Sequence, residues 1–144
     1  MVADYYNMPE TFSRCNIMYF EGKLPFPQFE LLHSYRTCGY FEYTPWSLFH
    51  WKTFRNPIIK ISDYYDFSQR QYDEIMCHEM IHYYLAYTGI DRKCDHGKEF
   101  NKMAKELNRK YKMNIFKYVD TSKYTKSKKA PYLSYWTLKM IGAI

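Results

Sequence analysis

The chain has 144 residues, enough for one domain with a sizeable core and too few for two ordinary domains. Its composition, 47% hydrophobic and 25% charged with a high aromatic share of 21%, argues against a disordered chain. The formal net charge is +6, and no apolar run approaches the roughly 18 to 20 residues of a membrane span. The N-terminus lacks the basic and apolar regions of a signal peptide, so we expect a soluble, cytoplasmic protein that binds no membrane.

The first predicted elements are a helix and a small sheet. Residues 9–20 begin with Pro9 in the first turn and place apolar side chains near one side, which predicts a helix. Residues 29–62 contain short runs of β-branched and aromatic residues, which predict three or four antiparallel strands. Turn-forming residues separate these runs: Gly39, Pro45, Asn56 and Pro57.

Two further helices follow the strands. Ser68, with Gln71 three residues later, forms a capping-box pattern, and the helix that it opens is predicted to end at Gly89. Another helix is predicted over about residues 96–111, with Asp95 as its N-cap. Its apolar residues recur at helical spacing and form a predicted buried stripe: Phe100, Met103, Ala104 and Leu107.

The order of elements predicts an α+β fold, in which a small antiparallel sheet packs against the N-terminal helix and the helix after Ser68. We expect residues 1–120 to form the domain. Residues 121–144 are expected to form a basic linker and an aromatic tail docked on the same domain. The four cysteines are widely separated and form no CxxC pair, which indicates free thiols.

The helix after Ser68 carries the motif HEMIH at residues 78–82. Residues four apart in a helix lie almost above one another, so His78 and His82 can direct their imidazoles at one point. Neutral imidazoles at this spacing suit Zn²⁺, which binds nitrogen at about 2.0 to 2.1 Å. Glu79 lies about 100° further round the helix, where it is free to take a proton from a zinc-activated water. This is the HExxH arrangement of metallopeptidases.

The competing interpretation is a buried amphipathic helix whose histidines are satisfied by neighbouring groups. Burying two histidines and a glutamate on one side of a helix without a metal would be unfavourable, which favours the metal site. A catalytic zinc site needs a third protein ligand, for which His96 is the preferred candidate and Glu99 the alternative. Four other residues of ligand type are expected to pack or to lie at the surface: His33, His50, Cys77 and Cys94.

Five segments carry a resemblance to a known family: YFEGKLP at 19–25, TCG at 37–39, PIIKIS at 57–62, CHEMIHYYL at 77–85 and HGKEF at 96–100. They resemble the SprT-like zinc metallopeptidase domain family, which includes the DNA–protein crosslink protease Spartan, over about residues 11–108. The resemblance implies a compact zincin-like fold, one catalytic zinc ion held by His78, His82 and His96, and Glu79 as general base. It also strengthens the choice of His96 over Glu99.

The C-terminal third departs from many members of that family, because it lacks their zinc ribbon with paired CxxC motifs. Residues 98–144 hold twelve Lys and Arg and three Asp and Glu, against nine and twelve in residues 1–97. Four lysines are therefore candidate nucleic-acid ligands: Lys123, Lys126, Lys128 and Lys129. Nearby aromatic residues could stack on bases or pack on the domain: Tyr124, Tyr132, Tyr135 and Trp136.

The leading functional hypothesis is a zinc-dependent endopeptidase that acts on protein substrates, including proteins bound to DNA. The alternative is a DNA-associated binding protein with a structural zinc or a vestigial peptidase site. A metallohydrolase for a non-protein amide is a third possibility. The sequence leaves the oligomeric state open.

Overall fold

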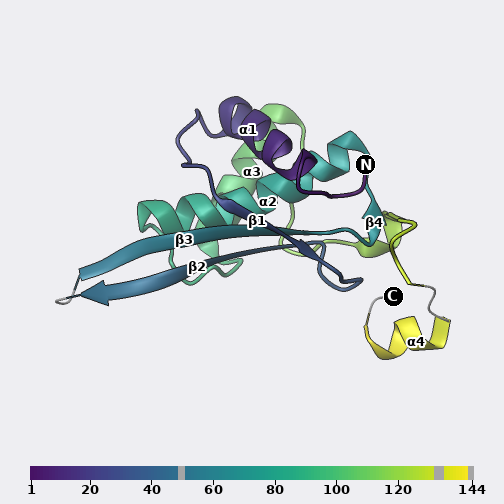
Figure 1. The fold of residues 1–144 in the computed structure, drawn as a ribbon. Helices are drawn as coiled ribbons and strands as arrows, with labels where there is room; N and C mark the ends of the chain where they lie inside the picture. Colours follow the sequence, from purple (N-terminus) through teal and green to yellow (C-terminus); the bar gives the residue numbers. More distant parts are fainter. Residues whose placement is uncertain (49–50, 132–134, 143–144) are drawn as a thin grey trace.

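The computed structural model describes residues 1–48, 51–131 and 135–142, with the backbone alone for 46–48, 51–53, 135 and 138. Its main body combines a three-stranded sheet with three helices, and a short two-stranded sheet lies at one end (Figure 1). The mixed α+β class is as predicted. In the described part of the chain, no helix is long and apolar enough to cross a membrane.

The main sheet consists of β1 (Gln28–Leu32), β2 (Gly39–Leu48) and β3 (Trp51–Ser62), with β3 in the middle. β2 and β3 form an antiparallel hairpin, whereas β1 runs parallel to β3 with Phe29 opposite Ile59. The prediction of a wholly antiparallel sheet is therefore wrong for β1. Each connection reverses the chain, so β3, which inserts between the two earlier strands, has to run in the direction of β1.

A bulge explains why the predicted break at Asn56 and Pro57 does not end a strand. The runs on either side of these residues belong to one strand, β3, whose pairing with β2 slips where Tyr43 faces both of them. Asn56 has a positive φ of 51°, a left-handed conformation that asparagine tolerates better than most residues. Because residues in a bulge are not all paired, Pro57 is accommodated without the N–H that a regular ladder requires.

The long helices are α1 (Asn7–Tyr19), α2 (Gln69–Thr88) and α3 (Lys98–Tyr111). α2 lies between the sheet and the other two helices (Figure 1). The predicted capping box is confirmed, since the Gln71 N–H donates to Ser68 Oγ at 3.2 Å and the Ser68 N–H donates to Gln71 Oε1 at 2.9 Å. α2 ends at Gly89 as predicted, and this glycine adopts a left-handed conformation with a φ of 77°.

The start of α3 differs from the prediction, because its N-cap is Gly97 and not Asp95. Asp95 Oδ1 instead accepts a hydrogen bond from the Gly97 N–H at 3.1 Å, which closes a turn before the helix. His96 is therefore left in the loop between α2 and α3. The predicted stripe of α3 is buried at Phe100, Ala104 and Leu107 and half-buried at Met103.

Stacked aromatic rings fix α2 on the sheet. The buried ring of Tyr83 lies parallel to those of Phe41 on β2 and Phe54 on β3, with centroids 5.3 and 5.6 Å apart. The Tyr83 hydroxyl donates to the carbonyl oxygen of Pro25 at 2.7 Å. Such ring contacts stabilise the core beyond the burial of apolar area, and here they set the rotation of α2 about its axis.

The C-terminal segment contains the short elements η1 (Thr121–Lys123), β5 (Thr125–Lys126) and α4 (Tyr135–Met140). β5 pairs with β4 (Tyr65–Asp66), and the Tyr124 ring packs 5.2 Å from that of Phe67. α4 stands away from the main body (Figure 1), and Trp136 on it is 70% exposed. Two predicted stacking residues lie outside the described side chains: Tyr132 and Tyr135.

Candidate metal centre

Three histidines from two segments meet beside α2. His78 and His82 stand one turn apart on the helix, and both are buried. His96 reaches them from the loop before α3, with its Nε2 2.9 Å from Nε2 of His78 and 3.2 Å from Nε2 of His82. All three ligand atoms lie within 4.8 Å of one another. The structure thus brings together the three residues that the sequence proposed as metal ligands.

Two residues of α3 hold this cluster in place. The buried Phe100 ring has its centroid 4.7 Å from those of His78 and His82 and 4.8 Å from that of His96. The side-chain amide of Asn101 donates to the backbone carbonyl of His96 at 3.1 Å. The HGKEF segment therefore supplies both a candidate ligand and the aromatic ring against which all three imidazoles pack.

Burial keeps the three imidazoles neutral. It lowers the pKa of His78 to about 3, together with the nearby His82 and His96 and against an opposing effect of the Phe116 backbone. The pKa of His82 falls to about 4 through burial and then His96. Burial, followed by the charge of Lys117, also lowers the pKa of His96. Neutral imidazole is the form that binds a metal ion.

A divalent cation fits this donor set. Bonds of about 2.0 to 2.1 Å in a tetrahedral zinc site separate neighbouring nitrogens by roughly 3.3 Å, close to the two separations seen here. Neutral imidazole has only one N–H, so three Nε2 atoms that face one another cannot satisfy each other fully. Nδ1 of His78 and of His82 is buried and has no hydrogen-bond partner among the described residues.

Glu79 lies next to the cluster in an apolar setting. It is 5% exposed, and burial raises its pKa to about 8. Gly39, the first residue of β2, closes against it: a Cβ on Gly39 would lie 2.8 Å from Glu79 Oε1 and 3.0 Å from Cγ. Any side chain at position 39 would therefore have to displace the carboxylate. The sequence indicates Gly39 as a turn residue and as part of the TCG segment of the family resemblance, but no local pattern points to this contact.

The other candidate ligands lie elsewhere. Glu99 lines a separate cavity of about 400 Å³ with Tyr84 and Lys102. Cys94 lines a cavity at the cluster but is not among the converging ligand atoms. Cys77 is buried and contacts Cys15 of α1. For the remaining two histidines, His33 Nδ1 lies 2.8 Å from Asp63 Oδ1, and His50 is outside the described residues.

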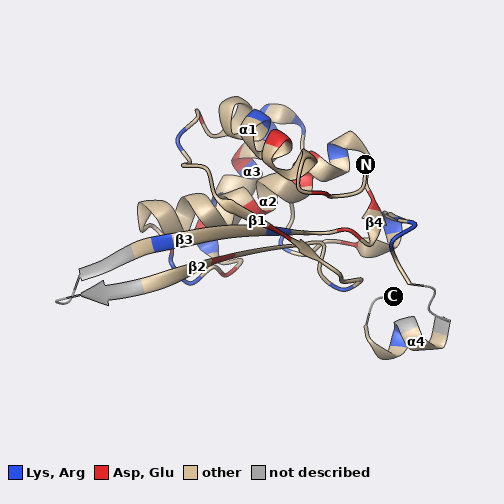
Figure 2. Ribbon diagram, viewed as in Figure 1, with Lys and Arg blue, Asp and Glu red and all other residues tan. Residues whose placement is uncertain are grey.

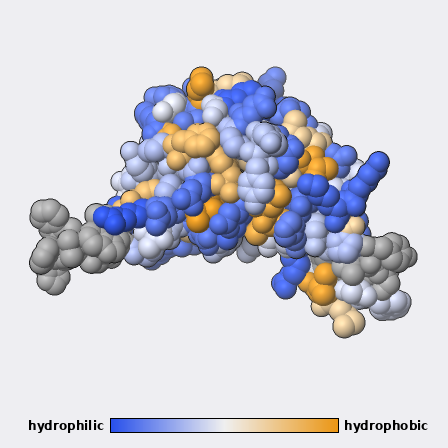
Figure 3. Space-filling view, in the orientation of Figure 1, coloured by the Kyte–Doolittle hydropathy of each residue, from blue (hydrophilic) through white to orange (hydrophobic). Residues whose placement is uncertain are grey.

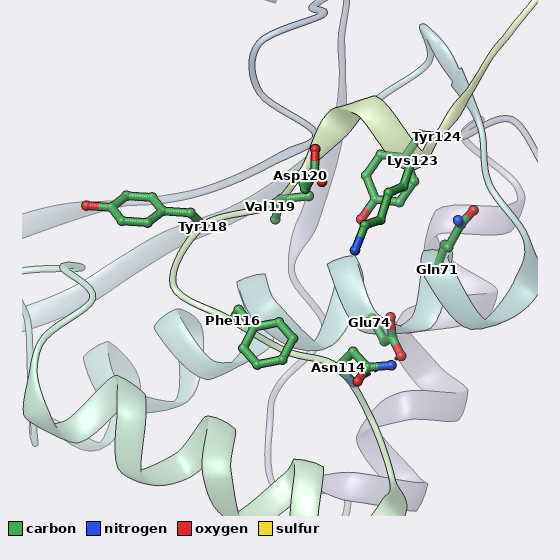
Figure 4. Close-up of a pocket in the computed structure, with 9 residues that line it drawn as sticks. All are labelled: Gln71, Glu74, Asn114, Phe116, Tyr118, Val119, Asp120, Lys123 and Tyr124. Atoms are coloured by element: carbon green, nitrogen blue, oxygen red, sulfur yellow. Dashed lines mark hydrogen bonds between the residues drawn. The ribbon is translucent and has the colours of Figure 1, made fainter. Parts of the chain in front are cut away.

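Two cavities of about 310 and 320 Å³ meet at the cluster. They share five lining residues: Thr37, Gly39, His78, Glu79 and His96. Tyr118 and Val119 line the first cavity and also a third one of about 390 Å³ beside it (Figure 4). His78, Glu79 and His96 thus line both cavities, whereas His82 lines only the second.

The four candidate nucleic-acid residues, Lys123, Lys126, Lys128 and Lys129, belong to the segment around β5, next to β4 (Figure 2). All four are exposed, and none lines either cavity at the histidine cluster. Lys123 lines the neighbouring 390 Å³ cavity and extends toward α2 (Figure 4). Lys126 Nζ lies 5.4 Å from the centroid of the Tyr35 ring, within the range of a cation–π contact.

The comparison with protein-family models agrees with the sequence motifs. The model of the SprT-like family matches residues 8–124, a longer stretch than the motifs alone had indicated. Neither the curated proteins nor the solved structures contain a match. The matched residues include the main sheet, the HEMIH motif on α2, the loop with His96 and the whole of α3. This chain belongs to the SprT-like family.

Proposed function

We propose that this protein is a zinc-dependent metallopeptidase with a zincin-like fold, in which His78, His82 and His96 hold one catalytic Zn²⁺. The observation that carries the proposal is the convergence of three neutral imidazole nitrogens next to a buried glutamate on the same helix. Membership of the SprT-like family supports it. The converging ligand atoms of the described residues are all imidazole nitrogens, with no carboxylate or thiolate among them, and such a donor set suits zinc.

When bound, the ion would polarise a peptide carbonyl and lower the pKa of a water molecule. Glu79 is placed to accept the proton of that water on its carboxylate and then to donate it to the leaving amine. Its buried setting raises its affinity for the proton, whereas a cation held by the histidines would favour its ionised form. These opposing effects poise Glu79 for both proton transfers.

Cavities on both sides of Glu79 support a substrate that lies across the site as an extended segment of protein. We also propose that the substrates include proteins bound to DNA. Exposed lysines around β5 support this, because none of Lys123, Lys126, Lys128 and Lys129 pairs with a carboxylate in the described part of the chain. Tight DNA binding without cleavage would instead favour a DNA-associated binding protein with a structural zinc.

The test compares zinc content and cleavage for the wild-type protein and the Glu79→Gln variant, with DNA-bound and free protein substrates. We expect about one zinc per chain in both proteins and a loss of cleavage by at least a hundredfold in Glu79→Gln. Glu99→Gln is the matched control, because Glu99 lies away from the histidines and should leave both quantities unchanged. Undiminished cleavage by a zinc-loaded Glu79→Gln protein would refute the proposed mechanism.

A further inference from the structure

The two cavities that meet at Glu79 differ in charge. Arg36 and Lys117 both line the 310 Å³ cavity, and its lining contains no carboxylate other than that of Glu79. Lys93 lines the 320 Å³ cavity, where its own loop also carries Asp91. Two of the three lysine and arginine residues that line these cavities therefore lie together on one side of the candidate metal centre.

Both cations of the 310 Å³ cavity are available to a ligand. Arg36 and Lys117 are exposed, and neither forms an ion pair within the described ranges of the chain. The contacts described for them are with uncharged groups: Lys117 Nζ lies 5.3 Å from the Tyr118 ring centroid, and Arg36 lies beside Gly142. Elsewhere, five side-chain cations do pair with carboxylates: Arg14, Lys23, Lys60, Arg70 and Arg109.

The acidic residues of the adjoining 390 Å³ cavity, Glu74 and Asp120, form no ion pair with Arg36 or Lys117 in the described part of the chain. Glu74 Oε1 accepts from the Asn114 N–H at 3.1 Å and pairs with Arg70 at 3.2 Å. Asp120 accepts from the backbone and hydroxyl of Ser122. Both carboxylates thus already have partners on their own elements or close to them.

We propose that the cleft selects protein segments with an acidic side chain close to the scissile bond, and that Arg36 and Lys117 bind this carboxylate. The proposal rests on the proposed peptidase function. A guanidinium can bind a carboxylate through two parallel hydrogen bonds, and an ammonium adds a second charge-assisted contact. Lysine or arginine at the same substrate position is disfavoured by like-charge repulsion.

The test measures peptide binding to the zinc-loaded Glu79→Gln variant of the 144-residue chain by calorimetry. Three peptides differ only in carrying Glu, Gln or Lys on each side of the central bond. We expect the Glu peptide to bind about tenfold more tightly than the Gln peptide, and the Lys peptide to bind most weakly. The same peptides are then offered to the wild-type protein, whose cleavage rates should follow the same order.

Substitutions at Arg36 and Lys117 test whether these two residues cause the preference for acidic peptides. In the Glu79→Gln background, Arg36→Glu with Lys117→Glu should reverse the order of the three peptides, and the milder Arg36→Gln with Lys117→Gln should abolish it. Lys105→Glu with Lys110→Glu is the matched control, because both residues are exposed on α3 outside the two cavities. Zinc content and thermal unfolding of each variant report whether it folds.

Equal binding of the three peptides, or an order that the Arg36 and Lys117 variants leave unchanged, would overturn the proposal. It would also be overturned if these variants lost binding of a single-stranded oligonucleotide but kept the order of peptide affinities. Arg36 and Lys117 would then bind nucleic-acid phosphates and not a substrate carboxylate. Equal cleavage of all three peptides leaves the peptidase function standing without this preference. Ranked binding without any cleavage by the wild-type protein leaves the preference standing and refutes the peptidase function.

Discussion

At the scale of single residues, the space between Gly39 and Glu79 sets the position of the proposed general base. A Cβ 2.8 Å from Glu79 Oε1 is not tolerated, so Gly39→Ala must move the carboxylate relative to the histidines. Because misplacement by about 1 Å can reduce catalysis roughly a hundredfold, we expect kcat/KM to fall ten- to a hundredfold while zinc content stays unchanged. Thr44→Ala, at an exposed position of the same strand, is the control. Full activity of Gly39→Ala would show that the carboxylate does not need this position.

The raised pKa of Glu79 also predicts a pH-dependent stability of the metal-free protein. The pKa is about 8 in the fold against an ordinary value of 4.5, so the folded state binds this proton more tightly than the unfolded state. The resulting stabilisation is present below pH 4.5 and is lost as the pH rises through 8, by up to about 1.4 kcal/mol per pH unit. Glu79→Gln has no such proton to lose.

Thermal unfolding in EDTA at pH 5, 7 and 9 measures this difference. We expect Glu79→Gln to gain stability relative to the wild-type protein as the pH rises. The histidines act in the opposite direction, because the lowered pKa values of His78 and His82 remove stability as the pH falls below 6.5. Both proteins share that contribution, so it cancels in the comparison. A constant difference from pH 5 to 9 would contradict the raised pKa.

At the scale of elements, local chemistry made the helices predictable. The capping box at Ser68 and the left-handed stop at Gly89 depend on residues next to each other in the sequence, and both are present in α2. The direction of β1 depends on where β3 inserts, and the bulge at Asn56 depends on the partner strand. Such non-local choices leave no periodic signal in the chain, which is why the sheet was only partly predicted.

The residues of the candidate site likewise divide into those predictable from local spacing and those that depend on contacts between distant segments. One helical turn brings His78 and His82 together, so their spacing was sufficient to predict the pair. The position of His96 beside this pair depends on the turn between α2 and α3. The family resemblance gave the strongest reason to choose His96 as the third ligand. The contact of Gly39 with Glu79, and the cavity that Arg36 and Lys117 both line, join segments far apart in the chain. No spacing in the sequence could have indicated them.

At the scale of the whole molecule, the basic C-terminal third does not form one surface. Figure 2 shows its cations spread over α3, the segment around β5 and α4. Of these residues, Lys117 lines a cavity at the candidate metal centre and Lys123 lines the next one. On the face shown in Figure 3, hydrophobic residues are interrupted by hydrophilic ones, so the described part of that face offers no broad apolar surface. Charge density along the sequence therefore overstated the size of any single basic patch.

Metal binding should stabilise the whole fold against unfolding, because the proposed ligands of the ion join α2 to the loop that leads into α3. Adding Zn²⁺ to the metal-free protein at about a hundred times its Kd should stabilise the folded state by roughly 2.7 kcal/mol, provided that the unfolded chain does not bind it. For a domain of this size, we expect Tm to rise by about 5 to 15 °C. His96→Ala should lose most of this rise and retain less zinc after dialysis, whereas Glu99→Ala should match the wild-type protein in both. An equal rise in all three proteins would mean that the ion binds without His96, and loss of zinc in Glu99→Ala alone would assign the third ligand to that carboxylate.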